Sequence, residues 1–101
     1  MSLLTISKAQ KQIAEFTREK RLSMGLTQSG LANRAGVSLS TLRKFEQKAV
    51  ISLESYLKLL MVLNQLENFI EAIKPESTNF QSIDDVLNDK KRKRPKKGWR
   101  S

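Results

Sequence analysis

The sequence of 101 residues contains no cysteine and no histidine. Without cysteine the chain cannot form disulfides, thiolate zinc sites or iron–sulfur clusters, and it has no thiol nucleophile. Without histidine it lacks the commonest metal ligand and the usual general base. Clustered carboxylates that could hold a catalytic metal are not apparent either. These absences argue against most classes of enzyme, and we expect no catalytic residue, no cofactor and no metal site.

What the sequence does contain is positive charge. Lysine and arginine number 19 against 10 aspartate and glutamate residues, a net charge of +9. Residues 1–75 carry a net +5, residues 76–89 carry four acidic and no basic side chains, and residues 90–101 carry eight basic and no acidic ones. Such a chain favours an acidic partner: nucleic acid, an anionic membrane or an acidic protein. We expect residues 90–101 to be a disordered basic tail that binds phosphate or an acidic partner surface, or else a solubilising end.

Hydrophobic residues make up 39% of the chain, enough for one small core. The longest apolar run, residues 59–63, is far shorter than the ~20 residues that span a bilayer. The first residues also lack the basic region of a signal peptide. The sequence therefore predicts a soluble intracellular protein with no membrane segment.

Apolar residues between positions 8 and 74 recur at steps of three and four, which predicts an all-α domain of five helices over residues 7–74. The first helix is expected to begin at Ser7, in a capping box with Gln10, and to end near Ser23 because Gly25 follows. Its expected apolar face consists of Ala9, Ile13 and Phe16.

Two short helices are expected next. Thr27 should cap a helix from Gln28 to about Ala35, Gly36 should break it, and Ser38 should cap another helix that ends near Lys48. So short a connection forces a steep angle between the two helices, which is the geometry of a helix-turn-helix. Their predicted inward residues are Leu31, Ala32, Leu42 and Phe45.

The remaining helices follow the same signals. Ser52 should cap a fourth helix, and a fifth should follow Asn64 and end before Pro75, which disfavours a helical conformation in the preceding residue. Residues 75–89 are predicted to be a separate amphipathic segment for docking or dimer contacts. Within it, residues 80–87 are expected to form a short helix with a capping box at Ser82 and Asp85. Its apolar residues are Phe80, Ile83, Val86 and Leu87.

Several short motifs stand in register with these elements: Gly25-Leu26-Thr27-Gln28, Leu31-Ala32, Ala35-Gly36-Val37-Ser38, Ser40-Thr41-Leu42 and Phe45-Glu46. Together they resemble the lambda-repressor-like (Xre, Cro/CI type) helix-turn-helix family over roughly residues 10–73. The resemblance implies a transcriptional repressor that binds double-stranded DNA as a homodimer on an inverted repeat. It also favours a cytoplasmic, nucleoid-associated protein. Leu39 and Gly30 depart from the pattern, where relatives often carry a polar base reader and a glutamate.

The resemblance also implies which residues meet DNA. An α-helix fits the major groove, and the start of the second helix of the pair presents side chains to base edges. The implied base-contacting residues are Leu39, Ser40, Arg43 and Lys44. The implied phosphate-contacting residues are Thr27, Gln28, Ser38 and Gln47. Phosphate contact and solvated charge remain equal alternatives for Arg18, Lys20, Arg21, Arg34 and Lys48.

Two further predictions concern protein partners. Apolar residues at the end of the fifth helix, beyond what a small core needs, are expected to make dimer or partner contacts or to be plain core; they are Phe69, Ile70 and Ile73. Residues 38–60 also resemble HipB-like regulators, which implies an alternative function as an antitoxin that represses its own operon and binds a HipA-type kinase toxin.

Overall fold

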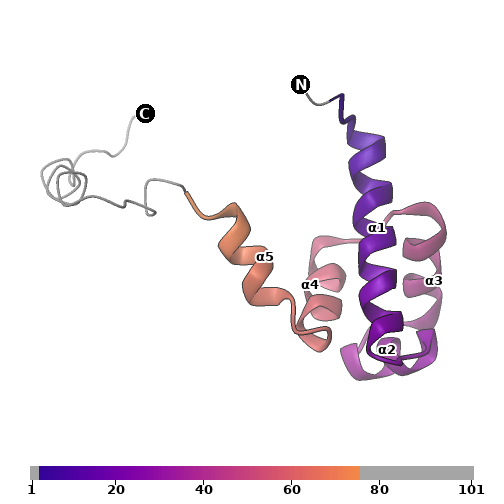
Figure 1. Ribbon diagram of the computed structural model, residues 1–101. Coiled ribbons are helices and arrows are strands. Elements are labelled where there is room, and N and C mark those ends of the chain that lie inside the picture. Colours follow the sequence, from indigo (N-terminus) through magenta and orange to yellow (C-terminus); the bar gives the residue numbers. More distant parts are fainter. Residues whose placement is uncertain (1–2, 76–101) are drawn as a thin grey trace, which may run out of the picture. The chain divides into compact units, whose positions relative to one another are not determined.

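A computed structural model describes residues 3–75, which contain five α-helices and no strand (Figure 1). The predicted all-α class and the number of helices are confirmed. The chain divides into two units, Met1–Phe69 and Ile70–Ser101. Residues 80–87 and the basic tail, for which we predicted a docking helix and disorder, lie outside the described residues. The helices are α1 (Ile6–Ser23), α2 (Gln28–Ala35), α3 (Leu39–Lys48), α4 (Leu53–Val62) and α5 (Leu66–Ile73).

Hydroxyl side chains cap three of these helices where the sequence predicts them. Thr27, Ser38 and Ser52 precede α2, α3 and α4 in extended conformation. Each accepts a hydrogen bond from the amide three residues further along, at 2.9, 3.1 and 3.1 Å. An N-cap of this kind typically stabilises a helix by about 1 kcal/mol, so the sequence itself fixes these three starting points.

The start of α1 differs from the prediction. Thr5 is the N-cap, and its side chain accepts a hydrogen bond from the amide of Lys8 at 3.1 Å. Ser7 therefore lies inside the helix, and the predicted capping box with Gln10 is wrong. Both hydroxyls are competent caps, and the helix extends to the earlier one because Ile6 and Ser7 can both adopt helical geometry. The other end agrees with the prediction, since Gly25 follows the helix with a φ of +71°.

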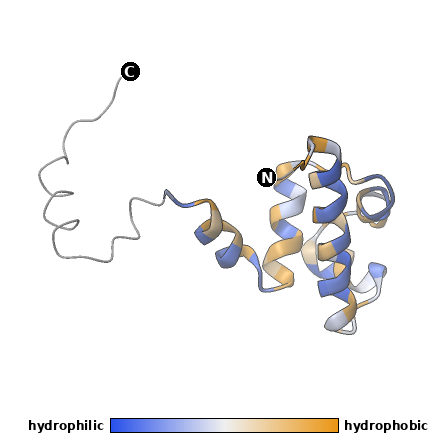
Figure 2. Ribbon diagram, turned by 45° about the horizontal axis from the view of Figure 1, so that its top comes forward, coloured by the Kyte–Doolittle hydropathy of each residue, from blue (hydrophilic) through white to orange (hydrophobic). Residues whose placement is uncertain are grey.

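The core lies among α2, α3 and α4, with α1 packed against α3. Figure 2 shows hydrophobic and hydrophilic residues mixed along every helix, as amphipathic helices around a common core require. The predicted inward residues of α2 and α3 are confirmed as buried. The fully buried side chains are Leu31, Leu42, Phe45, Leu59 and Leu63.

The inward face of α1 is not the predicted one. Ala14, Thr17 and Arg21 are the buried residues of this helix. In contrast, Ile13 is 42% exposed and Phe16 is 60% exposed. Relative to the prediction the helix is rotated by about a quarter turn, given 100° per residue. The rotation has a polar cause: Thr17 lies 3.3 Å from the hydroxyl of Tyr56, and Arg21 pairs with a carboxylate of α3.

Aromatic rings connect α3, α4 and the start of α5. The ring of Tyr56 packs edge-on against Phe45 with centroids 5.6 Å apart, and against Phe69 at 5.9 Å. Phe69 thus contributes to the packing of its own unit. In the second unit, Ile70 and Ile73 are exposed, and α5 ends before Pro75 as predicted.

Candidate nucleic-acid interface

A turn of three residues, Gly36 to Ser38, joins α2 to α3. Gly36 caps α2 in the left-handed conformation, with a φ of +72°, which glycine adopts without steric cost. The amide of Val37 then bonds back to the carbonyl of Ala32 at 3.0 Å, and the Val37 side chain is buried. Ser38 begins the next helix at once by capping it. The turn is thus held by both its backbone and its one apolar side chain, which fixes the angle at which α3 leaves α2.

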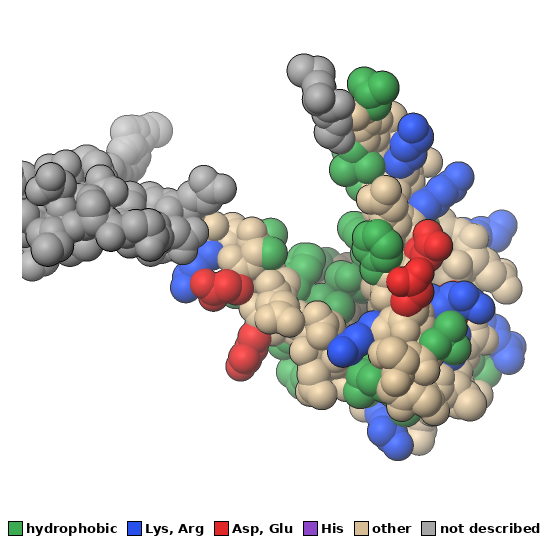
Figure 3. Space-filling view, viewed as in Figure 1, with side chains coloured by type: hydrophobic (Ala, Val, Ile, Leu, Met, Phe, Trp, Pro, Cys, Tyr) green, Lys and Arg blue, Asp and Glu red, His purple; other side chains and the backbone are tan. Residues whose placement is uncertain are grey.

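Helix α3 presents one face to the core and the other to solvent. Leu42 is 0% exposed and Phe45 is 2% exposed, so the inward face is anchored firmly. Lysine and arginine side chains gather on the side of the molecule where α3 lies (Figure 3, right). The exposed residues on the outer face of α3 are Ser40, Arg43, Lys44 and Gln47.

Glu46 connects three helices beneath this face. Its side chain is 4% exposed and accepts two hydrogen bonds from Arg21 of α1, from Nε at 2.8 Å and from Nη2 at 3.0 Å. Gln28 of α2 donates its side-chain amide to the same carboxylate at 2.9 Å. Arg21 also donates through Nη1 to the carbonyl of Leu26 at 2.8 Å. A bidentate arginine–carboxylate pair of this kind has strict geometry, so it sets α3 relative to α1 and to the start of α2.

Sequence reasoning missed this network. Arg21 was expected to meet phosphate or solvent, and that prediction is wrong because the residue is 6% exposed and paired. A signal was present, since Glu46 follows Leu42 by four residues and therefore shares its inward face. A charge placed on a core face needs a buried partner of opposite sign. No local pattern, however, identifies a partner that is 25 residues away.

Comparison with known families agrees with this geometry. Residues 18–67 match a family model described as Helix-turn-helix. The chain carries a lambda-repressor-like helix-turn-helix domain. A domain of this family makes the protein a DNA-binding transcription regulator. Comparison with curated proteins and with solved structures finds no match to the chain.

The helix-turn-helix domain presents the predicted base-contacting residues together. Ser40, Arg43 and Lys44 are exposed on the outer face of α3, and Leu39 is half-buried at its first position. The hydroxyl of Ser40 lies 3.2 Å from that of Ser38. Contact of these four residues with bases stays a prediction.

The predicted phosphate-contacting residues have different surroundings. Thr27 and Ser38 are exposed caps at the first turns of α2 and α3, and Gln47 is exposed on α3. The side chain of Gln28 is instead held by Glu46. Gly30 supplies the amide that Thr27 caps, so the helix forms regularly at this departure from the family pattern. Phosphate contact by these residues stays a prediction.

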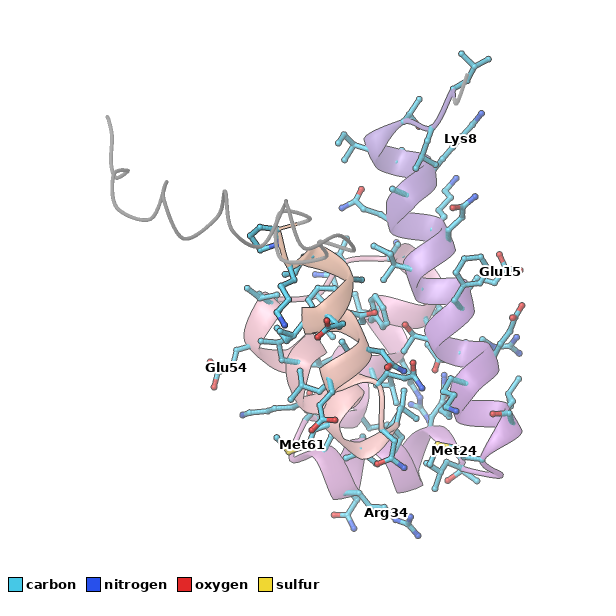
Figure 4. All side chains as sticks on the ribbon, turned by 60° about the vertical axis from the view of Figure 1, so that its left-hand side comes forward. Lys8, Glu15, Met24, Arg34, Glu54 and Met61 are labelled. Carbon is cyan, nitrogen blue, oxygen red and sulfur yellow. The ribbon has the colours of Figure 1, made fainter. Side chains whose placement is uncertain are left out.

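Other cations surround the same domain. The side chain of Arg18 is 54% exposed and has its Nε 3.9 Å from a carboxylate oxygen of Glu46. Arg34 and Lys48 are exposed, and Figure 4 shows Arg34 projecting away from the body of the domain. Within residues 3–75 no group of acidic side chains is placed to hold a metal ion. Among the described helices none has the length and apolar character needed to span a membrane.

Proposed function

We propose that the protein is a sequence-specific transcriptional repressor that acts as a homodimer on an inverted-repeat operator. The observation that carries this proposal is the outer face of α3. It holds a hydroxyl, a guanidinium and an ammonium group on one solvent-facing surface, while Leu42 and Phe45 anchor the opposite face. The major groove admits a single α-helix, so a rigidly held helix with polar outer residues is suited to enter it.

The side chains on this face define a reading chemistry. Arg43 and Lys44 can donate to the O6 and N7 atoms of guanine, the commonest specific contact in the major groove. Ser40 can donate or accept and so suits several bases. Leu39 offers only apolar contact, for which the thymine methyl group is the natural partner. We therefore expect each half-site to contain at least one guanine opposite the middle of α3.

Positioning on the DNA backbone is assigned to the helix starts. Exposed amides at the N-terminus of a helix favour a phosphate, and Thr27 and Ser38 mark two such starts. Gln47 is placed one turn beyond Arg43 on α3 and can extend the contact. Gln28 supports the site from within, because its bond to Glu46 holds the start of α2 against α3.

The proposed dimer follows from symmetry. One module of this kind contacts a short stretch of DNA, and two modules related by a two-fold axis read half-sites about 34 Å apart. The resemblance of residues 38–60 to HipB-like regulators adds a kinase toxin as a second partner prediction. No contact among residues 3–75 bears on that partner, and the repressor is the function proposed here.

The test is a binding titration against DNA selected from a random library. Wild type should bind the selected site with a Kd of about 10⁻⁸ to 10⁻¹¹ M, well below its Kd for scrambled DNA of the same composition. Arg43→Ala should weaken the free energy of binding to the selected site by about 1–3 kcal/mol, because one base-edge contact disappears. It should also relax the base preference at one position.

Arg34→Ala is the matched control, because it removes an exposed arginine from α2 rather than from the outer face of α3. It should leave the base preference unchanged. Equal affinity of wild type for selected and scrambled DNA would reject sequence-specific repression. Equal effects of the two arginine substitutions on base preference would reject α3 as the reading helix.

Removing residues 90–101 tests the second contribution to affinity. This segment carries eight lysine and arginine residues and no acidic one. Its removal should weaken binding to selected and scrambled DNA by the same factor, because phosphate contacts do not depend on sequence. The slope of log K against log salt should fall by about 0.9 for each phosphate that the truncated protein no longer neutralises. An unchanged slope would show that the tail does not contact DNA.

A further inference from the structure

One side of α1 is apolar and exposed, and contiguous surfaces of this kind mark interaction sites. Ile6, Ile13 and Phe16 are 79%, 42% and 60% exposed, and Ala9 completes the series as a half-buried residue. Along the sequence these residues are separated by three, four and three positions. This is the a/d spacing of helices that pack along one another in coiled coils. We call these four residues the α1 stripe.

The stripe is one of three distinct faces of α1. The inward face holds Ala14, Thr17 and Arg21. Charged residues occupy the face roughly opposite the stripe, and Figure 4 shows Lys8 and Glu15 projecting there. In Figure 3 green side chains follow one edge of the helix and blue ones the other. The exposed charged residues of that face are Lys8, Lys11, Glu15 and Arg18.

The stripe lies where α1 is accessible to another molecule. The first turns of α1 extend beyond the end of α3 (Figure 1), and residues 3–8 are all exposed. Beside Ile13 lies an open groove of about 330 Å³, whose lining includes Val50, Leu53 and Phe69. Val50 and Leu53 are themselves 50% and 65% exposed. The apolar surface therefore continues from the stripe to the beginning of α4.

We propose that a second copy of this chain packs on the α1 stripe, with the two α1 helices antiparallel and the two-fold axis beside residue 11. In this register Ile6 meets Phe16 of the other copy, and the small Ala9 meets Ile13 of the other copy. Each large residue thus finds an apolar partner, and the surface is complementary to itself, as a two-fold interface requires. Gln10 and Gln12 flank the axis on either side and bring no like charges together.

Self-complementarity favours a second copy as the occupant, and charge is compatible with it at this surface. Two chains of net charge +9 repel each other, so copies associate best through a surface without lysine or arginine. The four residues of the stripe include neither. The same lack of cations makes it unsuited to nucleic acid, which binds through phosphate contacts. Because the stripe spans only about 15 Å of helix at 1.5 Å per residue, we expect a weak dimer, in the micromolar range, that operator binding reinforces.

This inference supplies the surface for the homodimer of the proposed repressor, and it is tested without DNA so that the two proposals can fail separately. Sedimentation equilibrium of the full chain should show a monomer–dimer equilibrium. Ile6→Glu and Phe16→Glu should each raise the dissociation constant at least about tenfold, the equivalent of about 1.4 kcal/mol. Leu22→Glu is the matched control, because Leu22 is an apolar residue of α1, 49% exposed, that lies off the stripe.

A second measurement tests the register. Because the chain has no native cysteine, a single introduced cysteine can be cross-linked only to the same cysteine of another copy. Under mild oxidation Gln12→Cys should form a disulfide-linked dimer, whereas Glu15→Cys, on the charged face of the same helix, should not. Thermal unfolding followed by circular dichroism confirms that each variant is folded.

Three outcomes would overturn the inference. The first is a wild-type chain that stays monomeric at all concentrations. The second is an equal increase in the dimer dissociation constant for Phe16→Glu and Leu22→Glu. The third is a dimer that Ile73→Glu disrupts and Phe16→Glu leaves intact, which would assign the interface to the end of α5.

Discussion

Glu46→Ala should lower the free energy of unfolding by about 3–5 kcal/mol, because it leaves the buried Arg21 without a counter-charge. Arg21 is 6% exposed and gives two hydrogen bonds to this carboxylate. The substitution also removes the acceptor of the Gln28 side chain. Since small domains are stable by about 5–15 kcal/mol, the variant should be close to unfolding at moderate temperature. Urea unfolding with linear extrapolation measures the change.

Two further variants show whether the buried pair is the cause. Arg18→Met removes an arginine whose side chain is 54% exposed and 3.9 Å from the same carboxylate, and it should cost less than about 1 kcal/mol. Replacing Arg21 and Glu46 together by methionine should lower the free energy of unfolding by less than the sum of the two single replacements. The difference, which is the coupling energy of the pair, should be about 0.5–3 kcal/mol. Strict additivity of the two losses would show that the pair does not act as a unit.

The consequence for DNA binding is specific to this network. Glu46 lies on α3 but faces away from the outer surface that we propose as the DNA reader. Its loss should therefore weaken operator binding without changing base preference, since the reading side chains remain present. Arg43→Ala should show the opposite pattern, with altered preference and nearly unchanged stability. Comparison of the two variants therefore distinguishes residues that hold α3 in place from residues that contact the bases.

Phe45→Ala should also lower the free energy of unfolding by about 3–5 kcal/mol, through loss of buried apolar surface and the cavity left behind. Phe45 is 2% exposed and packs edge-on against Tyr56, with ring centroids 5.6 Å apart. No smaller side chain at this position can bridge α3 and α4 in the same way. The temperature of unfolding, followed by circular dichroism, measures the effect.

The control for this substitution is Met61→Ala. Met61 is 64% exposed on α4, so its truncation should change stability by no more than about 0.5 kcal/mol. Selected operator DNA should raise the unfolding temperature of Phe45→Ala, because a ligand that binds only the folded state stabilises it. If Phe45→Ala lowers the free energy of unfolding by less than about 1 kcal/mol, which is below the range for truncating a buried phenylalanine, then Phe45 is not the anchor of α3.

Local signals were sufficient for the helices of the helix-turn-helix itself. Thr27 and Ser38 cap where expected, Gly36 breaks α2 in the left-handed conformation, and Leu42 and Phe45 are buried. These features depend on contacts within one turn of helix or on hydropathy at three- and four-residue spacing, and both can be read along the chain. Even the error at Thr5 concerned which of two nearby hydroxyls caps the helix.

The inward face of α1 was decided by tertiary structure. By hydropathy alone, Ile13 and Phe16 define the core face, yet Thr17 and Arg21 are buried and the two apolar side chains are exposed. A buried arginine is stable only beside its carboxylate, and that carboxylate lies 25 residues further along the chain. The sequence by itself determined the helices, the caps at Thr27, Ser38 and Ser52, and the outer face of α3. Only the tertiary structure could decide which face of α1 packs against the core, because that depends on a charge pair formed between helices distant in sequence. The same orientation of α1 exposes the α1 stripe.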